Sequence, residues 1–246
     1  MRFLEIDLIK GVAVILMVIF HVYYLGEHMN KMNINTSTGI LHIMAKFAHT
    51  IFIICMGINL VLTYQANKKK GKSKKEFYNK IIKKFIILIF VACIISYTSY
   101  LGFGYSMFVK FGIFHFMAFA SLITSLFVDK PIISMFSIII INILTELTKS
   151  NKLSFNNFNP YLGFITGLNT NFSSLDHFPL IPWLSYSLFG TIIGNKLYTN
   201  YERNFEELNL NNTINNSYIL KFISTLGSKS LLVYLVHFPL IYFLLK

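Results

Sequence analysis

The sequence predicts an all-α membrane protein, a polytopic bundle of about seven transmembrane helices that forms a single domain over residues 1–246. Hydrophobic residues make up 54% of the chain, charged residues make up only 13%, and mean hydropathy is +0.58. Several apolar runs approach the roughly 20 residues that a helix needs to cross a bilayer. This composition excludes an ordinary soluble protein.

The predicted spans are apolar runs, most of them rich in Ile, Leu and Phe. They cover residues 8–26, 41–65, 85–103, 107–128, 131–148, 178–198 and 229–245. A further apolar stretch, 160–168, is too short to cross a bilayer and is expected to be re-entrant or interfacial. If this stretch pairs with its neighbours, the number of spans becomes eight.

Lysine and arginine set the expected orientation. The chain carries a net charge of +12, and many of its lysines crowd into the loop 66–84. Because cytoplasmic loops are enriched in cations, this loop and the N-terminus are expected to be cytoplasmic. Loops 27–40 and 149–177 then lie outside, and an odd number of spans leaves the C-terminus outside. We therefore attribute the charge to topology rather than to nucleic-acid binding, and expect the protein in the cell membrane.

The first span has one face that is polar at both ends. Asp7, Lys10, Val14, Met17 and His21 are three or four residues apart, which places them along one side of a helix. Asp7 and Lys10 can pair at the inner end, either as a solvated ion pair or as part of a binding site. His21 lies near the outer end, roughly 16 Å of helix rise from Lys10. Such a face is expected to point into the bundle rather than at lipid.

Four histidines fall inside predicted spans: His21, His49, His115 and His237. Ionisable side chains in a membrane are costly and usually face the bundle interior, so each of the four is a candidate for function. The competing interpretation is that they hydrogen-bond to neighbouring helices. The sequence alone leaves both interpretations open.

The stretch Asp176-His-Phe-Pro-Leu-Ile-Pro-Trp183 leads into the sixth predicted span from outside. Pro182 suits the first turn of a helix, where a missing N–H costs nothing. Trp183, the only tryptophan of the chain, suits the membrane interface. Asp176 and His177 are expected either to bind a polar molecule or to cap the helix.

Four stretches resemble known membrane acyltransferases. Asp7-x-x-Lys-Gly followed by His21 resembles the first helix of the heparan-alpha-glucosaminide N-acetyltransferase catalytic-domain family. Lys10, ten residues and His21 also fit the signature of the related acyltransferase-three family, although arginine is more common than lysine at the first position. The other three resemble the heparan-type family in the same order along the chain: Lys110-Phe-Gly-Ile-Phe-His-Phe-Met117, Asp176–Trp183 and Leu226-Gly-Ser-Lys-Ser-Leu-Leu-Val-Tyr-Leu-Val-His-Phe-Pro239.

The resemblance implies a membrane enzyme that moves an acyl group, with acetyl expected, from cytoplasmic acyl-CoA to a hydroxyl or amine of an acceptor outside, such as a glycan. It implies acetyl-CoA or another acyl-CoA as the donor and no metal ion. A neutral imidazole is suited to take the proton of the acceptor. His21 is the first expected base, His115 the second, and His28, in the outer loop, the third. Direct transfer and an acyl-histidine intermediate both stay open.

The other expected contacts divide between the two ends of the bundle. The phosphates of the donor are expected to meet four residues at the inner end: Asp7, Lys10, Lys83 and Lys84. The acceptor is expected to meet four residues: Asp176, His177, Trp183 and His237.

Three other functions compete with this expectation. Histidines on several membrane helices at similar depth are also what a membrane haem protein would show. A transporter is less favoured, because the sequence has no internal repeat and no inverted pair of broken helices. A non-catalytic subunit of a membrane assembly would leave the histidines within the spans without a role.

Overall fold

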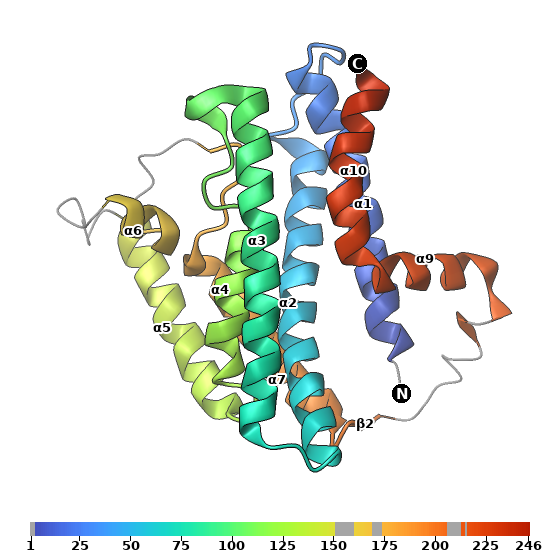
Figure 1. The fold of residues 1–246 in the computed structure, drawn as a ribbon, viewed down its shortest axis with the longest axis vertical. Coiled ribbons are helices and arrows are strands. Elements are labelled where there is room, and N and C mark those ends of the chain that lie inside the picture. The colour runs from blue at the N-terminus through green and yellow to red at the C-terminus, as the bar shows by residue number, and fades with distance from the viewer. Residues whose placement is uncertain (1–2, 151–159, 169–173, 206–212, 215) are drawn as a thin grey trace. The chain divides into compact units, whose positions relative to one another are not determined.

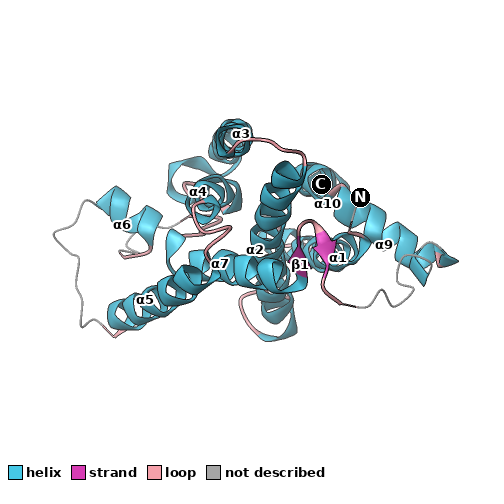
Figure 2. Cartoon of the chain, turned by 90° about the horizontal axis from the view of Figure 1, so that it is seen from below, coloured by secondary structure: helices cyan, strands magenta, loops and turns pink. Residues whose placement is uncertain are grey.

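The computed structural model describes residues 3–150, 160–168, 174–205, 213–214 and 216–246 (Figures 1 and 2). Within these ranges every regular element is a helix except one short hairpin, so the all-α fold class is confirmed. The chain groups into two compact units, Met1–Cys55 with Glu206–Lys246, and Met56–Phe205. The boundary falls inside the long second helix, and a single functional domain over 1–246 stays a prediction.

The first unit contains α1 (Leu4–His28), the beginning of α2 (Gly39–Lys69), α9 (Tyr218–Ser228) and α10 (Ser230–Leu245). α1 packs against both α9 and α10. The last two helices follow each other with a bend of 87°, which is plain where α10 leaves α9 in Figure 1.

α1 buries the face that the sequence predicts to point inward. Val14 and Met17 are each 1% exposed, and Met17 packs in a core cluster with Ala13 and with Ala48 of α2. The glycine Gly227 lets α9 cross close to the inner part of this face, since a methyl group there would collide with a backbone carbonyl of α1. The predicted inward orientation is therefore confirmed.

The second unit begins with the rest of α2. Its further helices are α3 (Lys74–Met107), α4 (Ile113–Ser125), α5 (Pro131–Lys149), α6 (Pro160–Thr166) and α7 (Leu180–Leu197). A hairpin of β1 (Tyr198–Thr199) and β2 (Glu202–Arg203) follows α7 and is antiparallel. α3 packs on α4, and α7 packs on both α4 and α5.

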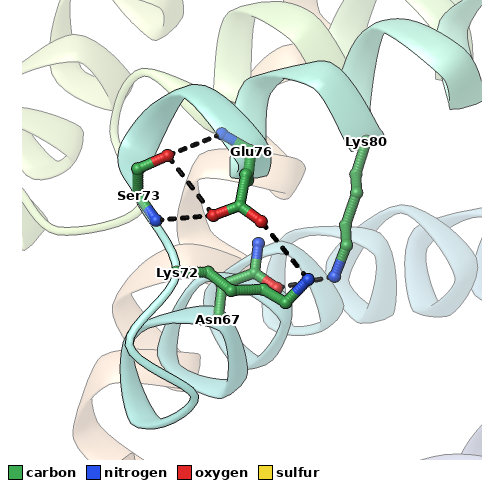
Figure 3. Close-up of polar contacts among 5 residues, drawn as sticks. All are labelled: Asn67, Lys72, Ser73, Glu76 and Lys80. Atoms are coloured by element: carbon green, nitrogen blue, oxygen red, sulfur yellow. Dashed lines mark hydrogen bonds and ion pairs between the residues drawn. The ribbon is translucent and has the colours of Figure 1, made fainter.

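The lysine-rich turn between α2 and α3 is held by a capping box (Figure 3). Ser73 Oγ accepts the backbone N–H of Glu76 at 3.3 Å, and the Glu76 carboxylate accepts the backbone N–H of Ser73 at 2.9 Å. Lys72 pairs with Glu76 at 3.4 Å. Lys80 donates to the side-chain oxygen of Asn67 at 2.6 Å. The loop predicted to be cytoplasmic is thus a hydrogen-bonded turn in which Lys72 and Lys80 are among the engaged lysines.

Other turns of the second unit lie at the same end as the turn between α2 and α3. Asp129, in the turn between α4 and α5, accepts the hydroxyl of Tyr64 at 3.1 Å and pairs with Lys74 at 3.4 Å. Gln65 of α2 donates to the carbonyl of Tyr198 at 2.8 Å, so the end of α7 also reaches the end of α2. These contacts gather the ends of α2, α4 and α7 with the beginnings of α3 and α5.

The predicted span 107–128 is helical over only part of its length. α4 has 13 residues, about 20 Å of rise, whereas a bilayer core is roughly 30 Å thick. The non-helical residues before α4 are bound to α3 instead: Ser96 Oγ donates to the carbonyl of Val109 at 2.6 Å, and the N–H of Val109 donates to Ser99 Oγ at 3.0 Å. Buried backbone needs such partners when it makes no helix.

Among the described residues, four helices are long and apolar enough to cross a membrane, namely α1, α2, α3 and α5. The bent pair of α9 and α10 makes a fifth if it is counted as one span. The predicted spans 178–198 and 229–245 correspond to the shorter helices α7, with 18 residues, and α10, with 16. The stretch 160–168 contains the seven-residue α6, in line with its expected shortness. Seven or eight spans and a cytoplasmic N-terminus stay predictions.

Hydroxyl groups join α7 to its two neighbours. Thr124 of α4 pairs with Ser187 at 2.7 Å, and Ser134 of α5 pairs with Thr191 at 3.0 Å. All four side chains are 0% exposed. Hydrogen bonds of this kind hold helices together in membrane bundles, where apolar contact alone discriminates poorly between lipid and protein.

Candidate functional site

His21 of α1 and His237 of α10 lie against each other in the first unit. Their ring centroids are 4.7 Å apart and their planes meet at 75°. Phe238 packs on both rings, with centroids 5.8 Å from His21 and 6.4 Å from His237. Tyr234, on the preceding turn of α10, lies 5.3 Å from His237. The sequence analysis placed both histidines in spans but did not pair them.

Backbone carbonyls fix the tautomer of both rings. His21 Nδ1 lies 2.8 Å from the carbonyl oxygen of Met17, and His237 Nδ1 lies 2.7 Å from that of Tyr234. A carbonyl cannot donate, so each Nδ1 carries the hydrogen and each Nε2 presents a lone pair. His237 is 5% exposed, and its Nε2 has no hydrogen-bond partner among the described residues. Each ring of this pair, with centroids 4.7 Å apart, thus offers one basic nitrogen.

His28, the third expected base, ends α1 and is exposed. Its ring packs on Tyr24 with centroids 4.2 Å apart, and its Nδ1 donates to the carbonyl of Tyr24 at 3.0 Å. The following loop is tied to the helix, because the N–H of Thr36 donates to the carboxylate of Glu27 at 2.9 Å. His49 of α2 is close enough to His21 to interact with it electrostatically.

Asp7 and Lys10 form the predicted ion pair at the inner end of α1, with 2.8 Å between Lys10 Nζ and Asp7 Oδ1. The pair is largely buried rather than solvated, since the two side chains are 16% and 8% exposed. The close crossing of α9 at Gly227 covers this part of the helix. A phosphate approaching Lys10 would therefore compete with Asp7.

Lys83 and Lys84 belong to α3 in the second unit. Lys83 is exposed and Lys84 is partly buried. Their expected proximity to Lys10 stays a prediction.

Two of the sequence motifs meet within the second unit. Asp176 Oδ2 accepts the backbone N–H of Ile113 at 3.0 Å and so caps the first turn of α4. Next to it, the N–H of Phe178 donates to the carbonyl of Phe111 at 2.9 Å. Burial raises the pKa of the Asp176 carboxyl to about 6, although the N–H of Ile113 acts in the opposite direction. The expected capping role of Asp176 is thus found, but on α4 rather than on the helix that follows it in sequence.

Ser174 and Gly112 also belong to this joint, and the sequence does not predict their part in it. Ser174 Oγ accepts the N–H of Lys110 at 3.1 Å and donates to the carbonyl of Asp176 at 2.7 Å. A methyl group on Gly112 would collide with the Asp176 carboxylate, so glycine is required at this close approach. The only signal in the sequence is a glycine directly before an apolar run, which does not identify a partner 64 residues away.

His177 is held against α6. Its Nε2 donates to the carbonyl of Phe164 at 2.9 Å, and the two rings stack with centroids 3.9 Å apart. Burial lowers the pKa of His177, while the Phe164 carbonyl acts in the opposite direction. The ring is therefore neutral near pH 7. Residues 151–159 and 169–173 of the predicted outer loop 149–177 lie outside the described residues.

His115 and Trp183 lie near the same joint. His115, in the first turn of α4, is half-buried and stacks on Phe111 with centroids 5.5 Å apart. Trp183 packs on Phe178 at 5.0 Å and on Tyr186 at 5.6 Å. The structure therefore gathers one set of expected site residues in each unit.

Comparison with known families decides between the functions that the sequence left open. Residues 2–239 match the family described as heparan-alpha-glucosaminide N-acetyltransferase, catalytic. The chain belongs to this family. It is an integral membrane acetyltransferase, and the resemblance on which the sequence analysis relied is confirmed. No curated protein and no solved structure matches the chain.

The match to the heparan-alpha-glucosaminide N-acetyltransferase family includes all four motifs, from Asp7 to Pro239. In this member, the first and last motifs meet at His21 and His237, and the two middle motifs meet at Ile113 and Asp176. Family membership favours an acetyltransferase over the haem protein, the transporter and the non-catalytic subunit.

Proposed function

We propose that this family member transfers an acetyl group from cytoplasmic acetyl-CoA to a hydroxyl or amine of an acceptor on the outer side of the membrane, with His21 as the base. The observation that carries the assignment is the fixed tautomer of His21. Its Nδ1–H is bound by the Met17 carbonyl at 2.8 Å, which leaves Nε2 as a lone-pair base. His115 and His28 are the second and third candidates.

The reaction needs one base and a dry site. The oxygen or nitrogen of the acceptor attacks the carbonyl carbon of the thioester while its proton passes to His21 Nε2. The C–S bond then breaks, and the thiolate of CoA leaves and takes up the proton. A positioned base of this kind contributes a factor of roughly 10² to 10⁴ in rate. The aromatic rings of Phe20 and Phe238 around His21 help to keep water away from the acyl group.

The donor site is proposed at the inner ends of the helices. Lys83 is exposed and offers its charge to the phosphates of acetyl-CoA, with Lys84 beside it on α3. Lys10 contributes as part of its pair with Asp7, which keeps the ammonium in place. A lysine contacts phosphate as a point charge, without the bidentate geometry of arginine.

The acceptor site is proposed at the outer end, with contacts from Asp176, His177, Trp183 and His237. The family name refers to an alpha-glucosaminide, so a simple alkyl α-glucosaminide is the first acceptor to test. A glycan of the cell envelope would present the same amine or hydroxyl to an enzyme of the cell membrane.

The haem alternative also conflicts with the packing of His21 and His237. Axial imidazoles bind haem iron from opposite faces of the macrocycle. His21 and His237 instead touch each other, with centroids 4.7 Å apart at 75°, which leaves no room for a macrocycle between them.

The test uses purified protein reconstituted in vesicles, with acetyl-CoA, methyl α-glucosaminide and a thiol reagent that reports free CoA. We expect acceptor-dependent thiol release by the wild type and a loss of roughly 100-fold or more in His21→Ala. His115→Ala and His28→Ala should retain most of the rate if the order of candidates is right. Full activity of His21→Ala would overturn the assignment of the base.

A further inference from the structure

The Nε2 atom of His237 is a buried acceptor that the resting protein leaves unused. Its Nδ1 is fully engaged, 2.7 Å from the Tyr234 carbonyl and 3.2 Å from the Val233 carbonyl. Its Nε2 has no hydrogen-bond partner in the described part of the chain. A buried polar atom without a partner lowers stability, so its retention calls for an explanation.

The ring that carries this nitrogen packs against the ring that we assign as the base. The rings of His21 and His237 are 4.7 Å apart, and both Nδ1 hydrogens are held by the carbonyls of their own helices. Both Nε2 atoms are therefore lone pairs, and neither can donate to the other. A hydrogen bond between them becomes possible only when one Nε2 has taken up a proton.

We infer that His237 is a positioning residue for acetyl transfer: its Nε2 accepts the hydrogen that His21 Nε2 acquires from the acceptor. The inference rests on the proposed function, because it requires His21 to be the base. The proton moves from the acceptor to His21 Nε2 and from there to the thiolate of CoA, and His237 neither gains nor loses a proton. Its lone pair only stabilises the His21 imidazolium between these two transfers.

The interaction would act on the rate rather than on ground-state binding. It is absent while His21 is neutral and forms as the positive charge develops, so it stabilises the transition state more than the bound substrate. Tight packing supports this role, because the ring contact with Phe238 and the bond to the Tyr234 carbonyl hold the His237 ring in one orientation.

Two substitutions of His237 test whether the lone pair of Nε2, rather than the ring itself, is required. His237→Phe keeps a planar ring but removes the acceptor, whereas His237→Gln can place an amide oxygen near the former Nε2. Phe243→Leu is the matched control, because Phe243 lies on the same helix, is exposed and plays no part in the proposed site.

The measurement is thiol release in vesicles at varied acetyl-CoA and methyl α-glucosaminide, beside the thermal midpoint of each variant. We expect His237→Phe to lower kcat roughly 10- to 100-fold with little change in the KM for acetyl-CoA, and His237→Gln to recover a clear part of kcat. Phe243→Leu should stay within a few-fold of wild type. The double variant His21→Ala with His237→Phe should be no slower than His21→Ala alone, because the two residues act as one unit.

The outcomes separate this inference from the proposed function. If the wild type releases no thiol, or if His21→Ala is fully active, the proposed function itself fails. If His21→Ala is inactive while His237→Phe turns over at the wild-type rate, only the role of His237 is overturned. If His237→Phe does not fold, His237→Leu takes its place as the variant without an acceptor atom. Equally slow His237→Leu and His237→Gln, both folded, would then contradict the need for an acceptor.

Discussion

Asp176 shows how one residue can join two distant parts of the chain and also make stability depend on pH. Its carboxylate caps α4 through the N–H of Ile113, yet burial raises its pKa to about 6. In the unfolded chain the same group titrates near its ordinary value of 3.8. The folded protein therefore binds the proton more tightly, and the stabilisation is complete below about pH 4 and lost as the pH rises through about 6.

Asp176→Asn should remove this pH dependence, because an amide oxygen can still accept from Ile113 but does not ionise. As the pH rises from 4 to 7, we expect the thermal midpoint of the wild type to fall relative to that of Asp176→Asn. The full effect is about 3 kcal/mol at most, from a difference of roughly two pKa units. The midpoints are measured in detergent at several pH values.

Asp176→Ala is the matched comparison. It leaves the N–H of Ile113 without its partner, which costs about 1–3 kcal/mol at every pH. If Asp176→Asn followed the wild-type pH curve unchanged, the buried carboxyl would not be the titrating group.

At the residue scale, the sequence predicts contacts between residues that are close along the chain, but not contacts between distant residues. The pair of Asp7 and Lys10 was predictable because residues three apart on a helix are neighbours. The contact of His21 with His237, and the cap that Asp176 provides for Ile113, join residues of different helices. No periodicity or spacing within one sequence encodes such pairs, although the motifs that contain them were recognised.

At the scale of elements, length and apolarity decided what could be predicted. α1, α2, α3 and α5 cover the corresponding predicted spans, because long apolar runs bounded by charge have few alternatives to a helix. The span 107–128 was wrong as a continuous helix. Its first part is just as apolar, but serine side chains of α3 and the 174–178 segment satisfy its backbone instead of a helical turn.

Gly112→Ala tests this joint between α4 and the 174–178 segment. A methyl group at Gly112 would meet the Asp176 carboxylate and, at 2.7 Å, Cγ1 of Val109, so one of them must move. We expect a loss of thermal stability of about 1–3 kcal/mol, the usual cost of forcing extra volume into a packed site. The measurement is the thermal midpoint in detergent.

Gly102→Ala is the control for that change. Gly102 lies in α3, and a methyl group there would have nothing within 4 Å. Alanine favours a helix over glycine by up to about 1 kcal/mol, so this variant should be as stable as wild type or slightly more stable. Equal losses in both variants would mean that the collision with Asp176 does not matter.

At the scale of the whole molecule, the number of crossings depends on elements that fail simple criteria for a span. α4 is short, and α7 carries hydroxyl groups that lower its hydropathy. Yet Asp129 after α4 binds Tyr64 and Lys74, and Tyr198 after α7 binds Gln65. Each helix thus returns the chain to the end of the second unit from which α3 and α5 start. A hydropathy threshold judges each helix by its own length and composition. The path of the chain also depends on which turns are in contact.

We therefore expect α4 and α7 to cross the membrane, and single cysteines can test this in a background without Cys55 and Cys93. Lys130→Cys in the turn after α4, and Lys196→Cys in the last turn of α7, should behave like Lys70→Cys in the lysine-rich turn. In right-side-out vesicles a membrane-impermeant maleimide should label none of the three until the membrane is opened. Such cation-rich turns are expected on the cytoplasmic side.

The opposite pattern should be found at the other turns. Asn33→Cys after α1 and Ser150→Cys after α5 are both exposed positions and should be labelled in intact vesicles. Labelling of Lys130→Cys from outside, together with Asn33→Cys, would show that α4 does not cross and would reduce the number of spans below seven. Agreement at all five positions would instead leave His21 on a helix that runs between a cytoplasmic donor site and an outer acceptor site.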